Sequence, residues 1–196
     1  MSKPANTRQT LLFKIKNQYD EAAWDDFVQF YRPYVYRVIQ NLEVSACDRE
    51  DIIQEVMLAS WKKLPEFEYD TAKGRFRSWL CTVARRTAFA FHEKKNKSAN
   101  FEDAVKNEEL SSGVAAEIED LSLREWERHI ADMAWKNVSE KFDEQVLMAF
   151  KKLASGEKGE DVAAELGLSQ NSVYVYKKRV MAALQKEIAY LDDELS

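Results

Sequence analysis

The chain has 196 residues, of which 45% are hydrophobic and 32% are charged. This length fits two small domains joined by a linker, and the composition excludes wholesale disorder. Because the chain holds only 5 Gly and 3 Pro, we predict an all-α fold rather than a turn-rich sheet protein. We find no apolar signal core at the N-terminus and no stretch of about 18 apolar residues. We therefore expect a cytoplasmic protein that makes no membrane contact.

Charge alternates along the chain. Residues 62–97 contain 10 basic and 4 acidic side chains, whereas residues 20–61 contain 3 and 9, and residues 98–135 contain 3 and 10. The net charge of -5 argues against a protein that simply coats nucleic acid. The alternation is typical of a protein that meets a phosphate backbone with one surface and a basic protein with another. Ordinary charge mixing on solvated helices is the alternative.

The first predicted helix covers residues 21–39. Apolar side chains recur there at steps of three and four residues, which indicates a helix with a broad buried face. Pro33 is expected to start a second helical segment or to kink the first.

The second predicted helix begins at Asp48, whose side chain is expected to cap free backbone N–H groups, and ends before Pro65. Its apolar stripe includes Ile53, Met57 and Trp61. Helical spacing places four residues on the opposite side of this helix, of which two are acidic, one is polar and one is apolar. This set comprises Asp51, Gln54, Glu55 and Leu58.

The third predicted helix follows a turn at residues 69–74 and runs from Phe76 to Phe91. Basic residues crowd its ends and outer face, interleaved with aromatic residues. Such a mixture is typical of a surface for single-stranded nucleic acid, because cations bind phosphates and flat rings stack on bases. Aromatic residues at these positions are also compatible with a helical core. The candidate residues are Arg75, Arg77, Trp79, Arg85, Arg86, Phe89, Lys94 and Lys95.

Helical periodicity weakens after residue 97, where acidic and small residues dominate. We predict a flexible acidic linker over residues 98–122, between domains at 7–97 and 123–196. Helical patterning returns near Leu123.

Residues 159–169 have the layout of a helix-turn-helix. Gly167 is expected to supply a positive-φ turn and Ser169 to cap the next helix, which begins at Gln170. Such a second helix lies in the major groove, with its early residues at the base edges. A purely structural helical hairpin is the alternative. The candidate DNA-contacting residues are Ser169, Gln170, Asn171, Ser172, Tyr174, Lys177, Lys178 and Arg179.

Three segments together carry a family resemblance. Residues 48–56 (DREDIIQEV), residues 74–85 (GRFRSWLCTVAR) and the helix-turn-helix follow one another in the order found in bacterial sigma factors. The chain resembles the extracytoplasmic-function (ECF) class of sigma-70-type RNA polymerase sigma factors over nearly its whole length from Trp24. The resemblance implies a region-two domain at 7–97 and a region-four domain at 123–196. It also implies a factor that binds core RNA polymerase and directs promoter-specific transcription initiation.

The resemblance assigns roles to the candidate residues. It implies that the acidic helix docks on a coiled coil of the polymerase's largest subunits, that residues 75–97 open the upstream promoter element, and that the helix-turn-helix recognises duplex DNA. An anti-sigma factor or a regulatory kinase is the further partner that the family implies. The polymerase-binding residues carried over are Asp48, Glu50, Asp51, Gln54, Glu55 and Leu58.

Some positions depart from the family pattern. Arg86 and Ala90 stand where Asn and Asp are common, so the family's strand-opening contacts do not transfer directly. Tyr174, Tyr176 and Met181 replace common basic residues, so the upstream sequence preference does not transfer either.

Other classes of protein explain fewer of these features. A stand-alone DNA-binding regulator would leave the acidic helix unexplained, and an all-helical adaptor would leave the order of the motifs unexplained. His92 and Glu93 resemble part of a zinc deaminase motif, but no downstream Cys pair completes it. Cys47 and Cys81 are isolated in the sequence. We expect no catalytic site, no metal and no cofactor.

Overall fold

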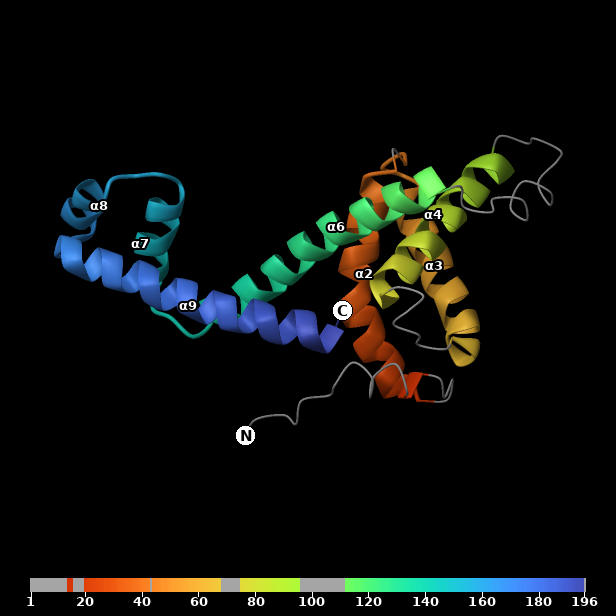
Figure 1. Cartoon of the computed structure of the whole chain (residues 1–196), viewed down its shortest axis with the longest axis horizontal. Helices are drawn as coiled ribbons and strands as arrows, with labels where there is room; N and C mark the ends of the chain where they lie inside the picture. The colour runs from red at the N-terminus through yellow and green to blue at the C-terminus, as the bar shows by residue number, and fades with distance from the viewer. Residues whose placement is uncertain (1–13, 16–19, 43, 68–74, 96–111, 196) are drawn as a thin grey trace. The chain divides into compact units, whose positions relative to one another are not determined.

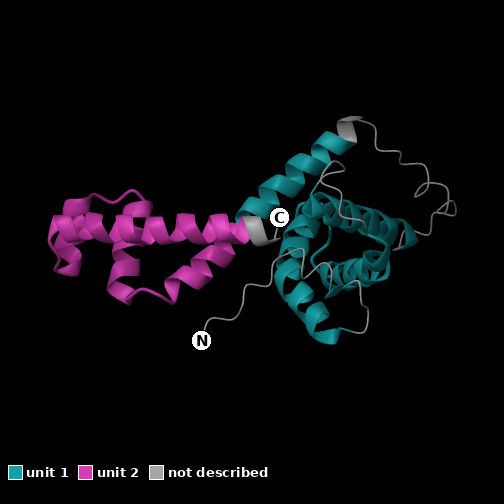
Figure 2. Ribbon diagram, turned by 60° about the horizontal axis from the view of Figure 1, so that its bottom comes forward, with its two compact units in different colours: residues 1–129, 196 teal, residues 130–195 magenta. Residues whose placement is uncertain are grey.

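The computed structural model describes residues 14–15, 20–42, 44–67, 75–95 and 112–195. All the regular elements among these residues are helices, which confirms the all-α class (Figure 1). The chain divides into two compact units, of which the first ends at His129 and the second spans Ile130–Leu195 (Figure 2). No helix in the described ranges is long and apolar enough to cross a membrane.

The first unit is built around three helices that pack on one another: α2 (Glu21–Gln40), α3 (Arg49–Lys63) and α4 (Phe76–Lys95). A short 3-10 helix, η1 (Leu64–Glu66), follows α3 directly. This part of the fold agrees with the helices expected from the spacing of apolar residues.

The start of α2 is capped and its middle contains a proline. The Asp20 carboxylate accepts a hydrogen bond from the Ala23 N–H at 3.0 Å, which satisfies one of the free donors of the first turn. α2 continues as one helix through Pro33, so this residue does not start a new helical segment. Pro33 is exposed, and its missing N–H costs the helix one backbone hydrogen bond on the solvated side.

Aromatic side chains form much of the core of the first unit. Phe27, Tyr31, Tyr34 and Phe76 are completely buried, and Trp126 is 1% exposed. Tyr31 packs edge-on against Phe76 with ring centroids 5.2 Å apart, and Tyr34 packs edge-on against Trp126 at 5.5 Å. Edge-to-face pairs of this kind stabilise by about 1 kcal/mol beyond their buried area.

α6 (Ser112–Ser139) corrects the predicted extent of the linker. Residues 98–111 lie outside the described residues, whereas residues 112–122 are helical rather than a flexible linker. The physical reason is burial: Ile118 and Ser122 are buried, and the Ser122 hydroxyl lies 3.1 Å from the Tyr34 hydroxyl of α2. The first part of α6, up to His129, therefore belongs to the first unit.

The second unit contains the end of α6, α7 (Glu144–Ala154), α8 (Gly159–Leu166) and α9 (Gln170–Leu195). Two clusters of buried side chains hold these helices together. One cluster joins α7, α8 and α9 and comprises Ala149, Leu153, Val162, Ala163 and Val173. The other joins α6, α7 and α9 and comprises Val138, Val146, Phe150 and Val180.

Candidate functional site

The exposed side of α3 has the composition expected from the sequence. Asp51, Gln54 and Glu55 are exposed, and Leu58 is 51% exposed although it is apolar. The opposite side of the same helix buries Ile52, Ile53, Val56, Met57 and Ser60 against the rest of the unit. Residues three and four apart share one side of a helix, which is why these four polar and apolar side chains lie together. We call Asp51, Gln54, Glu55 and Leu58 the α3 surface.

Asp48 and Glu50 differ from the α3 surface. Asp48 occupies the N-cap position of α3 but is 8% exposed, and its side chain makes no capping hydrogen bond, so the predicted cap is wrong. Its backbone carbonyl instead accepts the first hydrogen bond of the helix, from the Ile52 N–H at 3.1 Å. Glu50 is exposed and forms an ion pair with Arg32 of α2. Asp48 is therefore placed to support α3 rather than to meet a partner directly.

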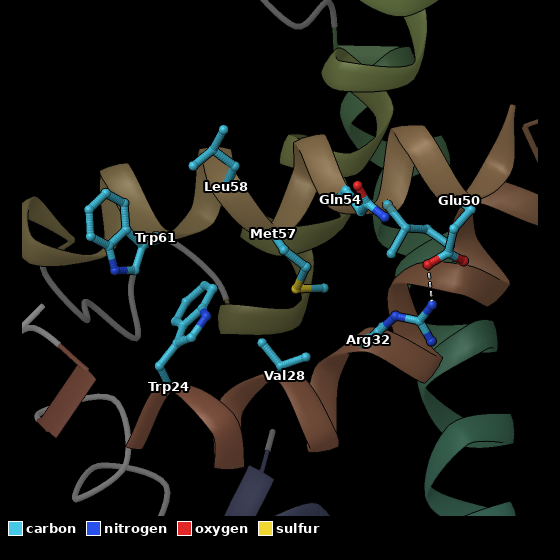
Figure 3. Close-up of a pocket in the computed structure, with 9 residues that line it drawn as sticks. Trp24, Val28, Arg32, Glu50, Gln54, Met57, Leu58 and Trp61 are labelled. Carbon is cyan, nitrogen blue, oxygen red and sulfur yellow. Dashed lines mark hydrogen bonds and ion pairs between the residues drawn. The ribbon is translucent and has the colours of Figure 1, made fainter. Parts of the chain in front are cut away.

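A groove of about 540 Å³ lies between α2 and α3, next to the α3 surface (Figure 3). Figure 3 shows Trp24 and Trp61 at one end of the groove and the Arg32–Glu50 pair at the other. Its lining is mostly apolar, and Gln54 and Leu58 belong both to the lining and to the α3 surface. An apolar groove beside exposed carboxylates suits a partner segment that carries both apolar and basic side chains.

α4 uses some of its predicted DNA-contacting residues for its own packing. Arg77 is 4% exposed, and its guanidinium lies 3.2 Å from the carboxylate of Glu119 on α6. Trp79 is half-buried, with its ring 4.8 Å from Phe67 and 5.2 Å from Phe76, centroid to centroid. Arg77 is thus a structural residue and not part of an exposed basic surface, which corrects its predicted role.

The remaining candidates on and near α4 are accessible to different degrees. Arg75, Arg86 and Lys94 are exposed, and Phe89 is 50% exposed. The Arg85 guanidinium lies 5.3 Å from the centroid of the Phe89 ring, a cation–π distance that pairs a charge with a flat ring. These two side chains line a second hollow of about 370 Å³ together with Glu117, Ile118 and Leu121 of α6. Lys95 belongs to α4, but its side chain lies outside the described residues.

The contact between α4 and the first part of α6, which we call the α6 seam, is polar at one end. The Glu119 carboxylate accepts hydrogen bonds from Arg77 at 3.2 Å and from the Ser78 hydroxyl at 2.5 Å. Farther along, the buried Cys81 thiol donates to the Ile118 carbonyl at 3.9 Å. Burial raises the pKa of the Cys81 thiol to about 12, which keeps it protonated and unreactive.

His129 lies on α6 and packs against α2. The imidazole is 3% exposed, with its ring centroid 5.7 Å from that of Trp126 and 6.2 Å from that of Tyr34. Burial, together with the nearby positive charge of Arg37, lowers the pKa of His129 from its usual 6.5 to about 4. His129 is therefore a neutral core residue at physiological pH.

The turn between α8 and α9 has the features expected of a helix-turn-helix. Gly167 adopts φ 64°, in the left-handed region that favours glycine, and the Leu168 N–H closes the turn on the Ala163 carbonyl at 2.9 Å. The Ser169 hydroxyl accepts the Ser172 N–H at 3.1 Å and so caps α9. Both sequence predictions, the positive-φ glycine and the serine cap, are confirmed.

The predicted DNA-contacting residues of the turn and α9 are largely accessible. The exposed members are Ser169, Gln170, Asn171, Tyr174, Lys178 and Arg179, whereas Ser172 and Lys177 are half-buried. The Arg179 guanidinium lies 5.8 Å from the centroid of the Phe142 ring, so this side chain also contacts its own domain.

The sequence did not predict several residues that lie near these surfaces. The open groove is lined by Trp24, Val28 and Trp61. The sequence had placed these residues in or beside the core-facing stripes of their helices. Glu119 fell in the predicted linker, where nothing in the local pattern indicated a partner on α4. Large aromatic side chains at the edge of an apolar stripe can mark a binding surface. Trp24 and Trp61 have this position, and the groove could have been predicted from them.

The described residues contain no group of three or more His, Cys, Asp and Glu side chains that could hold a metal ion. Cys47 is exposed and Cys81 is buried, and His92 and Glu93 are both half-buried on α4.

Comparison with known proteins finds a family match for one segment of the chain. Residues 27–98, which include α3 and α4, match the sigma-70 region 2 family. Two curated proteins named ECF RNA polymerase sigma factor SigK, from Mycobacterium bovis and Mycobacterium tuberculosis, are 33% identical over 70 residues. That match covers 36% of this chain, and the chain spans about a third of the length of these relatives.

A solved structure titled "Structure of CnrH in complex with the cytosolic domain of CnrY" aligns with 94% of this chain and 97% of that chain. The identity is 17% and the TM-score is 0.35. The all-helical fold and the match at residues 27–98 define a sigma-70 region 2 domain. Residues 27–98 of the chain are therefore similar to sigma-70 region 2, and the curated relatives that match the chain are ECF sigma factors.

Proposed function

We propose that this chain is a non-catalytic sigma factor that binds core RNA polymerase in the cytoplasm and directs transcription initiation at specific promoters. The observation that carries the proposal is the α3 surface: Asp51, Gln54, Glu55 and Leu58 are exposed together on a sigma-70 region 2 domain. The core contacts of α3 come from the opposite side of the helix, so these exposed side chains are not needed to bury the helix.

Polymerase docking is assigned to the α3 surface and the adjoining groove. A helical segment with apolar and basic side chains, such as the coiled coil of the polymerase's largest subunits, would place its apolar residues against Trp24, Met57 and Trp61. Its cations would meet Asp51 and Glu55. Complementary charge of this kind speeds encounter and fixes the register of the two partners.

Promoter opening is assigned to the exposed part of α4. Arg75, Arg86 and Lys94 supply positive charge for the phosphates, and the Arg85–Phe89 pair supplies a flat ring at which a base can stack. Arg77 has no direct part in this contact because it is buried against Glu119.

Recognition of duplex promoter DNA is assigned to α8 and α9. In a helix-turn-helix the first helix crosses the DNA backbone and the start of the second lies in the major groove. Asn171 is exposed in the first turn of α9 and suits a base edge, whereas Lys178 is exposed one turn beyond Tyr174 and suits a phosphate. An anti-sigma factor or a regulatory kinase is the further partner that we propose from the family.

The test is reconstitution of transcription. Purified chain is added to core RNA polymerase with fragmented genomic DNA of the source bacterium, and transcript 5′ ends are mapped. The proposal predicts discrete start sites that share an upstream sequence and appear only when the chain is present. A folded chain that yields no chain-dependent start site on any fragment would reject the proposal.

A further inference from the structure

Tyr174 of α9 rests on the first residue of α8. A Cβ atom added to Gly159 would lie 2.7 Å from the Tyr174 Oη, 2.8 Å from Cζ and 2.9 Å from Cε2. Real side chains do not approach so closely, so the tip of the Tyr174 ring lies directly over the Gly159 Cα. Gly159 is buried although it begins the helix, which follows from this cover. Its role is to leave space, since its φ is not in the left-handed region.

This contact holds a half-exposed side chain. Tyr174 is 49% exposed and belongs to neither buried cluster of the second unit. Tyr176, two residues along, packs against both clusters and is the matched structural tyrosine. A half-exposed ring that is already fixed loses less conformational entropy when its hydroxyl meets a ligand.

We propose that the Tyr174 hydroxyl donates a hydrogen bond to a phosphate of the promoter duplex and that Gly159 is the positioning residue for this contact. The inference rests on the proposed recognition of duplex DNA by α8 and α9. The first helix of a helix-turn-helix crosses the DNA backbone, and the Tyr174 hydroxyl lies at the start of that helix. Hydroxyl groups of tyrosine are among the donors that proteins use for phosphate oxygens.

The charges near Gly159 argue for a neutral donor at this position. Glu160 and Asp161 occupy the first turn of α8 and repel a phosphate that approaches the helix end itself. The phenol extends from α9 and can reach a phosphate beside these carboxylates. The neutral hydroxyl thus takes the place of the basic side chain common in the family at this part of the helix.

The experiment uses the full chain bound in excess to core RNA polymerase, with fluorescein-labelled duplexes that the wild-type complex has enriched from a random-sequence library. Tyr174→Phe should weaken duplex binding about tenfold or more, the loss expected for one hydrogen bond to a charged acceptor. The loss should be similar for all enriched sequences, and the dependence of affinity on salt should not change. Lys178→Ala, which removes a charge, should reduce that salt dependence by about one counterion. Tyr176→Phe is the control and should leave binding unchanged.

A double-mutant cycle tests the positioning role. Gly159→Ala should leave the thermal unfolding of the chain nearly unchanged, because the half-exposed Tyr174 ring can swing away from the new methyl group. It should nevertheless weaken duplex binding about as much as Tyr174→Ala, and the double variant should be no weaker than either single variant.

Three results would overturn the inference while leaving the proposed function intact. These are unchanged binding by Tyr174→Phe, independent losses that multiply in the double variant, and a Tyr174→Phe loss confined to one base position. The last result would assign Tyr174 to a base edge rather than a phosphate. A wild-type complex that enriches no duplex would overturn the proposed function, and the inference with it.

Discussion

The α3 surface and the α6 seam belong to the same unit but use their charged residues differently. On α3, Asp51, Gln54 and Glu55 are exposed and make no contribution to the core. At the seam, Arg77 is buried and paired with Glu119. Burial thus separates a charged residue that serves the fold from one that is accessible to a partner.

Reversing the charge of the α3 surface is the strongest test of whether this surface binds a partner. Asp51→Lys with Glu55→Lys should lower promoter-dependent transcription about 100-fold at limiting chain, because like charges placed opposite each other cost several kcal/mol. Excess chain should restore much of the output, since the defect lies in affinity. Glu127→Lys with Glu140→Lys makes the same change in net charge at exposed positions elsewhere and should have little effect. A matching defect in this control would show that net charge alone decides the result.

Removing the Arg77 side chain tests whether a charged residue at the α6 seam stabilises the fold. Arg77→Ala should lower the free energy of unfolding by about 2 kcal/mol, because it deletes a buried side chain and its charge-assisted hydrogen bond to the half-exposed Glu119. Arg86→Ala, at an exposed position of the same helix, should change the unfolding free energy by no more than about 0.5 kcal/mol and should instead weaken binding of single-stranded DNA. Urea unfolding and a DNA titration measure the two effects. The comparison fails if Arg77→Ala weakens DNA binding at unchanged stability.

The pH dependence of stability tests whether His129 of α6 is buried against α2. The folded pKa of about 4 lies below the usual 6.5, so the unfolded chain binds the proton first as pH falls. The contribution is intact above pH 6.5 and is lost as pH falls toward 4. At pH 5 the wild-type chain should be about 2 kcal/mol less stable than at pH 7 from this group. His129→Leu should lack this part of the pH dependence, and His92→Leu should keep it; equal profiles for all three chains would contradict burial of His129.

Leu58 gives the smallest expected effect. Leu58→Ser should weaken polymerase affinity about five- to tenfold, because it removes an exposed apolar side chain that has no core contact to lose. Its unfolding free energy should be unchanged. Met57→Ser, at 8% exposure, should instead destabilise the chain. Destabilisation by Leu58→Ser would mean that this residue serves the fold.

Sequence periodicity was enough to predict α2, α3, α4 and the α3 surface, because a residue's side of a helix follows from its spacing, but it missed the first part of α6. It also predicted the Gly167 turn and the Ser169 cap, which depend on neighbours within a few residues. It did not separate Arg77 from Arg86, since both are basic residues on α4 and only the docking of α6 buries one of them. Gly159 was missed for the same reason: its partner, Tyr174, lies on another helix.

The central claim, that the α3 surface binds core RNA polymerase, is tested most directly by titrating labelled chain with core RNA polymerase in the absence of DNA. The account predicts saturable one-to-one binding by the wild-type chain and by Arg86→Ala. It predicts binding at least about 100-fold weaker for the Asp51→Lys, Glu55→Lys chain, with an unchanged unfolding transition. Equal affinity of the wild-type and charge-reversed chains would contradict it.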